Sequence, residues 1–405
     1  MSSSHAPTAQ IEALDAFAQA TATGTAYAQL LAAREVDAAT CCLSDHGLSY
    51  RRRALLFEAQ TLLAMTDMRF SDAIEFSQES AGSWRGAGKH ANELAMQMAE
   101  VTAKIGEVHR DTIAVVPLTA KLEHLLAALV SAEPTRRQLV EGTLECGFAN
   151  LAVDRLTTAG DLFARALQVS GDDIERTRAI GASALCELQA GNERAARALA
   201  TKAIALARSI DDDLQLATLL RFMAGIHAAA DEPTEALEVA EESADLAEKL
   251  GEVQYASTLR LRGMLRVANT RTLEGCADME RAIVLLRNSA WTHTIPAEVL
   301  TLAQTLVGIG EHAKAEHVLR EHAPFLDKTA GDERAEIDVL RYSVAIRGGD
   351  HARAGAYAEN VGGLLAAAHH KDAATMYDAA ADAWTIAKEP THARRCREAG
   401  DRLRT

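Results

Sequence analysis

The chain has 405 residues, of which 57 are acidic and 42 basic, giving a formal net charge of −15. This acidic balance repels a phosphate backbone unless the bases gather on one face, so we expect no direct nucleic-acid ligand. Apolar residues make up 48% of the chain but aromatic residues only 4%, and there are 7 prolines. This composition favours closely packed helices built from small and aliphatic side chains over β-strands.

The beginning of the chain carries no targeting or membrane signal. No basic start precedes an apolar core, and we find no run of about 18 apolar residues such as a membrane span needs. We expect residues 1–7 to be disordered and the protein to be cytoplasmic, without a membrane partner. The 6 cysteines include no C-x-x-C pair, which favours a reducing compartment over a disulfide framework or a zinc site.

Residues 8–134 are expected to form irregular helical repeats. The helix predicted around "IEALDAFAQA" (11–20) has no clearly polar outer side, and a terminal repeat with an apolar outer face predicts a homodimer through this region. A small residue opens a predicted helix at Ala73, and a degenerate copy of that position is expected near Asp111.

Two prolines interrupt the next interval. Pro117 and Pro134 lie between Asp111 and the next small residue, Ala159. Because proline cannot continue a helix that has already started, we expect a break or a change in superhelix direction within residues 112–134. The predicted boundary between the irregular part and a regular array therefore lies between residues 134 and 135.

A pattern with a period of about 39 residues occupies 135–405. Each copy has a helix-ending residue, a polar turn and a small residue that opens the next helix, as in "LQAGNERAARALA". The spacings of these small residues are 37, 40, 39, 40, 39 and 39 for Ala159, Ala196, Ala236, Gly275, Ala315, Ala354 and Ala393. Such a period is the signature of a solenoid, in which each helical hairpin buries its apolar faces by stacking on its neighbours.

The spacing within a unit also has a mechanical meaning. Ala159, Phe163 and Ala166 fall at i, i+4 and i+7 on one helical stripe, where two small residues let a partner helix approach and Phe163 fills the gap. This small–large–small stripe resembles that of the tetratricopeptide repeat family, and Gly147 and Gly263 fall where that family has a small residue in its first helix. The last helix is polar enough to cap the array.

The resemblance implies an all-α fold, a right-handed superhelical solenoid of tetratricopeptide-like hairpins. The family's basic unit has about 34 residues, whereas the unit here is longer. The longer unit is similar to the tetratricopeptide-like arrays in signal-sensing regions of bacterial regulators. The family's modules that grip chaperone C-termini use a Lys/Asn/Lys/Arg clamp, and no matching set of asparagines is present here.

Three stretches that could form a phosphate, metal or redox site each have a simpler structural interpretation. The stretch "IRGGDHARAG" (346–355) could cradle a phosphate, but it is one copy of a recurring turn, and no phosphate-binding fingerprint is present. His312, His317 and His322 spread around a helix, which predicts solvated surface and no metal site. Cys41 and Cys42 lack a nearby base to lower a thiol pKa, and small apolar packing is the simpler interpretation. We expect no enzyme activity and no cofactor.

The inner surface formed by the stacked first helices is the predicted binding site. Alignment of the units brings three arginines into neighbouring positions, with apolar residues one or two turns further along, namely Arg178, Arg221, Arg260, Leu185, Leu188, Met264 and Val267. Arginine forks suit carboxylate or phosphate groups. The alternative is that each arginine pairs with a neighbouring acidic residue of the solenoid.

The leading hypothesis is therefore a protein-interaction module that binds a peptide or protein partner, an acidic one by this chemistry, in the groove. The alternative is a ligand- or peptide-responsive regulatory protein without its own DNA-binding domain.

Overall fold

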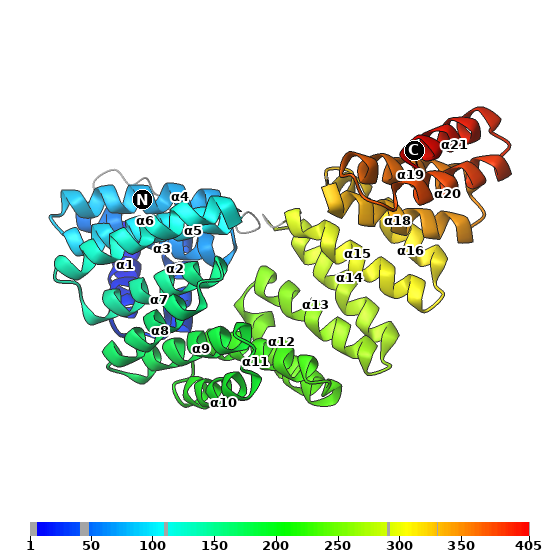
Figure 1. The fold of residues 1–405 in the computed structure, drawn as a ribbon. Coiled ribbons are helices and arrows are strands. Elements are labelled where there is room, and N and C mark those ends of the chain that lie inside the picture. The colour runs from blue at the N-terminus through cyan, green and yellow to red at the C-terminus, as the bar shows by residue number, and fades with distance from the viewer. Residues whose placement is uncertain (1–5, 41–47, 109–111, 290–291, 330, 405) are drawn as a thin grey trace. The chain divides into compact units, whose positions relative to one another are not determined.

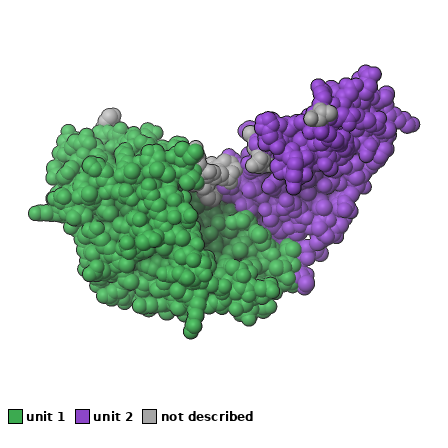
Figure 2. Space-filling view, in the orientation of Figure 1, with its two compact units in different colours: residues 1–269 green, residues 270–405 purple. Residues whose placement is uncertain are grey.

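The computed structural model describes residues 6–40, 48–108, 112–289, 292–329 and 331–404. All regular secondary structure within these ranges is helical, which confirms the predicted all-α class. The chain divides into two compact units, unit 1 with residues 1–269 and unit 2 with residues 270–405 (Figure 2). The boundary expected between residues 134 and 135 lies inside unit 1, and that division stays a prediction.

Within each unit, successive helices pack as antiparallel hairpins (Figure 1). Unit 1 contains α1 (Ala6–Thr23), α2 (Ala26–Thr40), α3 (Tyr50–Thr66), α4 (Phe70–Gly86), α5 (His90–Val108), α6 (Thr112–Ser131), α7 (Arg136–Ala152), α8 (Leu156–Val169), α9 (Asp173–Gln189), α10 (Glu193–Ser209), α11 (Asp213–Ala229), α12 (Pro233–Leu250) and α13 (Glu252–Ala268). Unit 2 contains α14 (Thr272–Arg287), the 3-10 helix η1 (Thr292–Thr294), α15 (Ile295–Gly308), α16 (His312–Glu321), α17 (Ala323–Leu326), α18 (Gly331–Arg347), α19 (His351–Ala367), α20 (Ala373–Ile386) and α21 (Pro390–Arg404). Since α1 begins at Ala6, the last two residues of the segment expected to be disordered are helical.

The predicted small residues occupy one structural position. Each is the fourth residue of the second helix in its hairpin, from Ala159 in α8 to Ala393 in α21, and Ala73 has the same place in α4. All of them are buried. A small side chain at this point lets the two helices of the hairpin approach closely, so the sequence period is a packing requirement.

The turns within the hairpins also share one conformation. The residue two positions before the second helix has a positive φ in eight hairpins: Met68, Asp154, Gly191, Asp231, Thr270, Gly310, Gly349 and Lys388. In one of them the Gly191 N–H donates to the Leu188 carbonyl (3.0 Å) and the Asn192 N–H to that of Glu187 (2.8 Å). These bonds satisfy the last carbonyls of the first helix.

The region around Pro117 differs from the prediction. Asp111 lies outside the described residues. The fourth residue of α6, which corresponds to the small residue of the other second helices, is Val115, and it is fully buried. A helix break at Pro117 is wrong, because α6 runs through this residue, and a change in superhelix direction within residues 112–134 stays a prediction. Pro117 is the sixth residue of the helix, so its missing N–H costs a single backbone bond close to the N-terminus, and burial of leucines such as Leu122 and Leu129 outweighs it.

Helix α6 is also the one described helix whose length and hydropathy would suit a membrane span, with a mean hydropathy of 1.7. A core helix passes the same test. Leu122, Leu126 and Leu129 of α6 share a buried cluster with Leu94 and Met98 of α5, so this face of the helix packs in the protein interior. The apolar window as a whole is 33% buried, and Ile113 at its start is 86% exposed.

The N-terminal hairpin α1–α2 connects distant parts of unit 1. Leu14 and Phe17 are fully buried in a core with α2 and α3. Across the unit, Asp212 accepts hydrogen bonds from the backbone N–H groups of Ala26 (3.1 Å) and Tyr27 (3.3 Å). The apolar side chains behind the expected homodimer are thus covered within the chain, and the dimer stays a prediction.

The first helices of unit 1 form a continuous layer. Each one from α3 to α13 packs on the next first helix, whereas consecutive second helices among the described residues have at most marginal contacts. In a curved solenoid the layer whose helices lie closer together is the concave one. We call the surface that α7, α9, α11 and α13 present on this concave side the inner face.

Candidate functional site: the inner face of unit 1

Arg178 on α9 forms an ion pair with Glu141 on α7, one repeat earlier. Both side chains are about three-quarters buried, with exposed fractions of 28% and 27%. For Arg178 the alternative considered from the sequence is therefore correct, because the arginine is neutralised inside the solenoid. Arg178 is therefore not a free cation that could bind a partner's carboxylate without first leaving Glu141.

Arg221 on α11 behaves differently. It is partly buried and has no hydrogen bond or ion pair with any described residue. Burial lowers the pKa of its guanidinium, and the nearby cation of Arg260 on α13 lowers it further. Arginine stays charged even so, and a half-buried cation without an anion is unfavourable. The structure therefore leaves Arg221 as a cation suited to receive an anion from outside the chain.

The predicted apolar residues also lie on these helices. Leu185 and Leu188 are partly buried on α9, against the cores of their hairpins. On α13, Val267 is partly buried and Met264 is 43% exposed. Their contact with a partner is not shown by the structure, and their role in binding stays a prediction.

Acidic residues of the first helices were missed by sequence reasoning. Burial, together with the charge of Glu141, raises the pKa of Glu145 on α7 to about 7, and the Thr102 hydroxyl donates to its carboxylate (3.2 Å). Burial likewise raises the pKa of Glu58 on α3 to about 7 although Trp84 Nε1 donates to it (3.3 Å). Both glutamates are partly exposed, so their desolvation fits a recessed surface. Isolated glutamates on helices give no sequence signal.

The histidines give no metal site. No group of three or more His, Cys, Asp or Glu among the described residues could hold a metal ion. His317 is solvated as expected, but the expectation was wrong for His322, which is only 6% exposed. His322 lies between the end of α16 and the start of α17, and its side chain is buried there. Cys41 and Cys42 lie outside the described residues.

The glycine-rich stretch is a hairpin bend, as the repeat pattern predicted. Gly349 has a φ of 76° between α18 and α19, and the Asp350 carboxylate accepts a hydrogen bond from the Arg353 N–H (3.1 Å) to cap α19. This turn therefore connects α18 to α19 and caps the N-terminus of α19. Asp350 and Gly348 also line a cavity in unit 2, which the sequence did not predict.

Comparison with solved structures identifies the architecture. A signal transduction ATPase with a tetratricopeptide repeat sensor from Pyrococcus horikoshii is similar over 85% of this chain and 53% of that chain, with 14% identity and a TM-score of 0.59. The apo form of RapI matches over 87% of this chain and 97% of that chain, with 12% identity and a TM-score of 0.54. The chain has the tetratricopeptide-like repeat fold.

A Rap protein complexed with Competence and Sporulation Factor shares this tetratricopeptide-like fold, over 86% of this chain and 98% of that chain, with 13% identity and a TM-score of 0.50. Neither a protein-family profile nor a curated protein sequence matches the chain. The predicted resemblance to tetratricopeptide repeat proteins is therefore confirmed at the level of the fold.

Proposed function

We propose that the protein is a non-catalytic interaction module whose inner face in unit 1 binds an acidic peptide or protein segment. The observation that carries this proposal is Arg221, a partly buried cation that lacks an anion among the described residues. A partner carboxylate at this point would form charge-assisted hydrogen bonds with the guanidinium, each contributing about 1.5–3 kcal/mol.

The neighbouring side chains suit an extended partner. Met264 offers exposed apolar surface one turn beyond Arg260 on the same helix. Glu145, with a pKa of about 7, is about half protonated near neutral pH and then repels an acidic segment less than an ordinary glutamate would. The proposed contact therefore combines one unpaired cation, an apolar anchor and a weakened local negative charge.

The similar structures support a role in regulation. One is described as a tetratricopeptide repeat sensor, and a Rap protein was solved in complex with Competence and Sporulation Factor. We infer that this chain is likewise regulatory, with a protein or peptide as its partner. A second candidate, a regulator that responds to a small ligand, is favoured by the separate cavity of unit 2.

Affinity capture from the native host's lysate tests the proposal. The intact protein is compared with an Arg221→Glu variant and with a matched Arg194→Glu variant, whose arginine is exposed on the second helix α10. A protein retained by the intact chain and by Arg194→Glu, but lost by Arg221→Glu, supports the inner face. Identical retention by all three would contradict it.

A further inference from the structure

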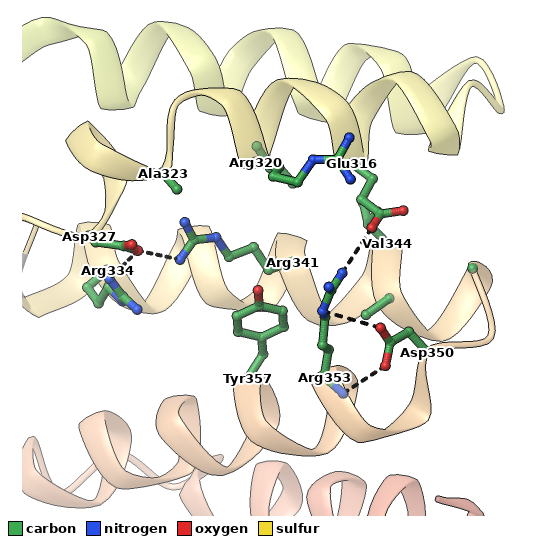
Figure 3. Close-up of a pocket in the computed structure, with 13 residues that line it drawn as sticks. Glu316, Arg320, Ala323, Asp327, Arg334, Arg341, Val344, Asp350, Arg353 and Tyr357 are labelled. Atoms are coloured by element: carbon green, nitrogen blue, oxygen red, sulfur yellow. Dashed lines mark hydrogen bonds and ion pairs between the residues drawn. The ribbon is translucent and has the colours of Figure 1, made fainter.

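Unit 2 contains a cavity of about 630 Å³ between α16, α18 and α19 (Figure 3). It exists because the second helix of this hairpin is broken. Helix α16 has 10 residues where α19 has 17, and Pro324 opens the 4-residue α17 after the break. The spacing of 39 from Ala315 to Ala354 is unchanged. The missing helical turns therefore uncover the surface of α18 without disturbing the repeat.

Four arginines and three carboxylates line the cavity, and most of them are paired. Asp327 accepts hydrogen bonds from Arg341 (2.9 Å) and Arg334 (3.2 Å) at one end. Asp338, which is fully buried, also accepts hydrogen bonds from Arg341 (3.3 Å) and Arg334 (2.7 Å).

The other end of the cavity contains Arg353. Its guanidinium contacts Glu316 (3.3 Å) and Asp350 (3.3 Å), so two carboxylates compensate one cation there. These interactions fix the walls of the cavity at both ends, and they use every lining carboxylate.

Three hydrogen-bond donors remain for a ligand in the middle of the cavity. Arg341 is 92% buried and lies over the Tyr357 ring at 5.6 Å, and its hydrogen bonds to carboxylates engage one of its two terminal nitrogens. The Tyr357 hydroxyl has no hydrogen-bond partner among the described residues, and Arg320 has no carboxylate partner among them. Figure 3 shows these side chains coming from three facing helices into one space.

The geometry points to a binding site for a small organic carboxylate, held by Arg341, Tyr357 and Arg320. The cavity volume lies within the range of about 300–1,000 Å³ that is typical of small-molecule sites. Leu319, Val344 and Ala345 add an apolar wall for the body of the ligand. This site lies apart from the inner face of unit 1, and the inference does not depend on the proposed partner binding.

The charges disfavour a doubly charged ligand. With Asp338 included, the carboxylates and arginines around the cavity balance, so any bound anion adds net negative charge. A single negative charge can pair with Arg320, which contacts the His317 ring (3.5 Å) but no carboxylate among the described residues, whereas a dianionic phosphate ester would leave a second charge near Glu316 and Asp327. Uncharged amides would leave the arginine donors without their preferred acceptor.

Ligand-observed NMR on the full-length protein tests the inference with named probes. Benzoate and hexanoate are compared with benzamide, hexanamide and phenyl phosphate. We expect the two carboxylates to bind in the millimolar range and the amides and phenyl phosphate to bind at least about tenfold more weakly.

Variants locate the site. Arg320→Ala should weaken carboxylate binding about tenfold, and Tyr357→Phe by a few fold, without loss of helicity. Arg394→Ala removes an exposed arginine of the same unit and should leave binding unchanged. The inference is overturned if neither carboxylate binds at about 10 mM, if amides or phenyl phosphate bind as well, or if the Arg320 and Arg394 variants behave alike.

Discussion

Arg178 and Glu141 are 37 positions apart in the sequence and form an ion pair between α9 and α7. The separation is about one repeat, and other pairs follow the same rule, including Arg353 with Glu316, also 37 apart, and Arg395 with Glu359, 36 apart. Stacking of the repeats therefore brings several arginines on helix faces to a carboxylate of a neighbouring repeat. Arg221 lacks such a partner among the described residues, and this exception supports the proposed inner-face site.

Replacement of Arg221 by methionine should separate stability from function. Loss of an unpaired, partly buried cation removes its desolvation cost and its repulsion by Arg260, so the melting temperature should rise by a few degrees. Partner binding should be lost in the same variant. Thermal unfolding followed by circular dichroism checks the first part, and a lower melting temperature would show that Arg221 has a stabilising partner.

Two glycines of first helices should respond oppositely to alanine. A Cβ at Gly147 would lie 2.3 Å from Phe163, so Gly147→Ala should destabilise unit 1 by about 1–3 kcal/mol. A Cβ at Gly225 meets nothing within 4 Å, and Gly225→Ala should stabilise its helix by up to about 1 kcal/mol. Urea unfolding of both variants measures the difference. Equal effects would contradict the packing described for the first hairpin helices.

Glu145 should make stability fall as the pH rises. Burial raises its pKa from an ordinary value of 4.5 to about 7 in the folded protein, so the penalty for its charge develops from pH 4.5 to 7 and is complete above pH 7. Glu145→Gln should therefore match the parent protein near pH 4.5 and exceed its free energy of unfolding by about 1–2 kcal/mol at pH 8. A gap that did not grow with pH would contradict the desolvation of this carboxyl.

His322 in unit 2 should make the free energy of unfolding fall as the pH is lowered, which is opposite to the effect of Glu145. Burial lowers the pKa of the imidazole below 6.5, so the folded protein favours its neutral form. The stability associated with this residue is present above pH 6.5 and is lost as the pH falls towards the folded pKa, because the unfolded chain then binds the extra proton. His322→Phe should reduce the loss of stability between pH 7 and pH 5. An unchanged pH profile would show that His322 is accessible to protons in the fold.

The repeat architecture was predictable because a packing requirement recurs. A small residue occupies the fourth position of the second helix in every hairpin of the regular array, and this made Ala159 to Ala393 visible as a period. The turn conformation was less visible, since Met68 and Lys388 adopt the same positive φ as Gly191. Helix ends enforce that conformation more strongly than residue type does.

The site was only partly predictable because side-chain pairing depends on three-dimensional neighbours. Sequence alignment of the units brought Arg178 and Arg221 into neighbouring positions, and only the structure shows that Glu141 neutralises the first. The cavity of unit 2 had one local sign, Pro324 inside a predicted second helix, but its lining comes from three helices. The bridge from Asp212 to the N-terminal hairpin spans 186 positions and has no sequence pattern.

The most direct test of the central claim is site-specific photo-cross-linking in cells of the native host. A photoreactive residue is placed at Met264 on the inner face, at Glu238 on the second helix α12 as a control, and at Met264 in an Arg221→Glu background. The account predicts a discrete protein or peptide adduct from Met264 alone, lost in the Arg221→Glu background. Adducts from Glu238 with none from Met264, or an unchanged Met264 adduct in the variant, would contradict it.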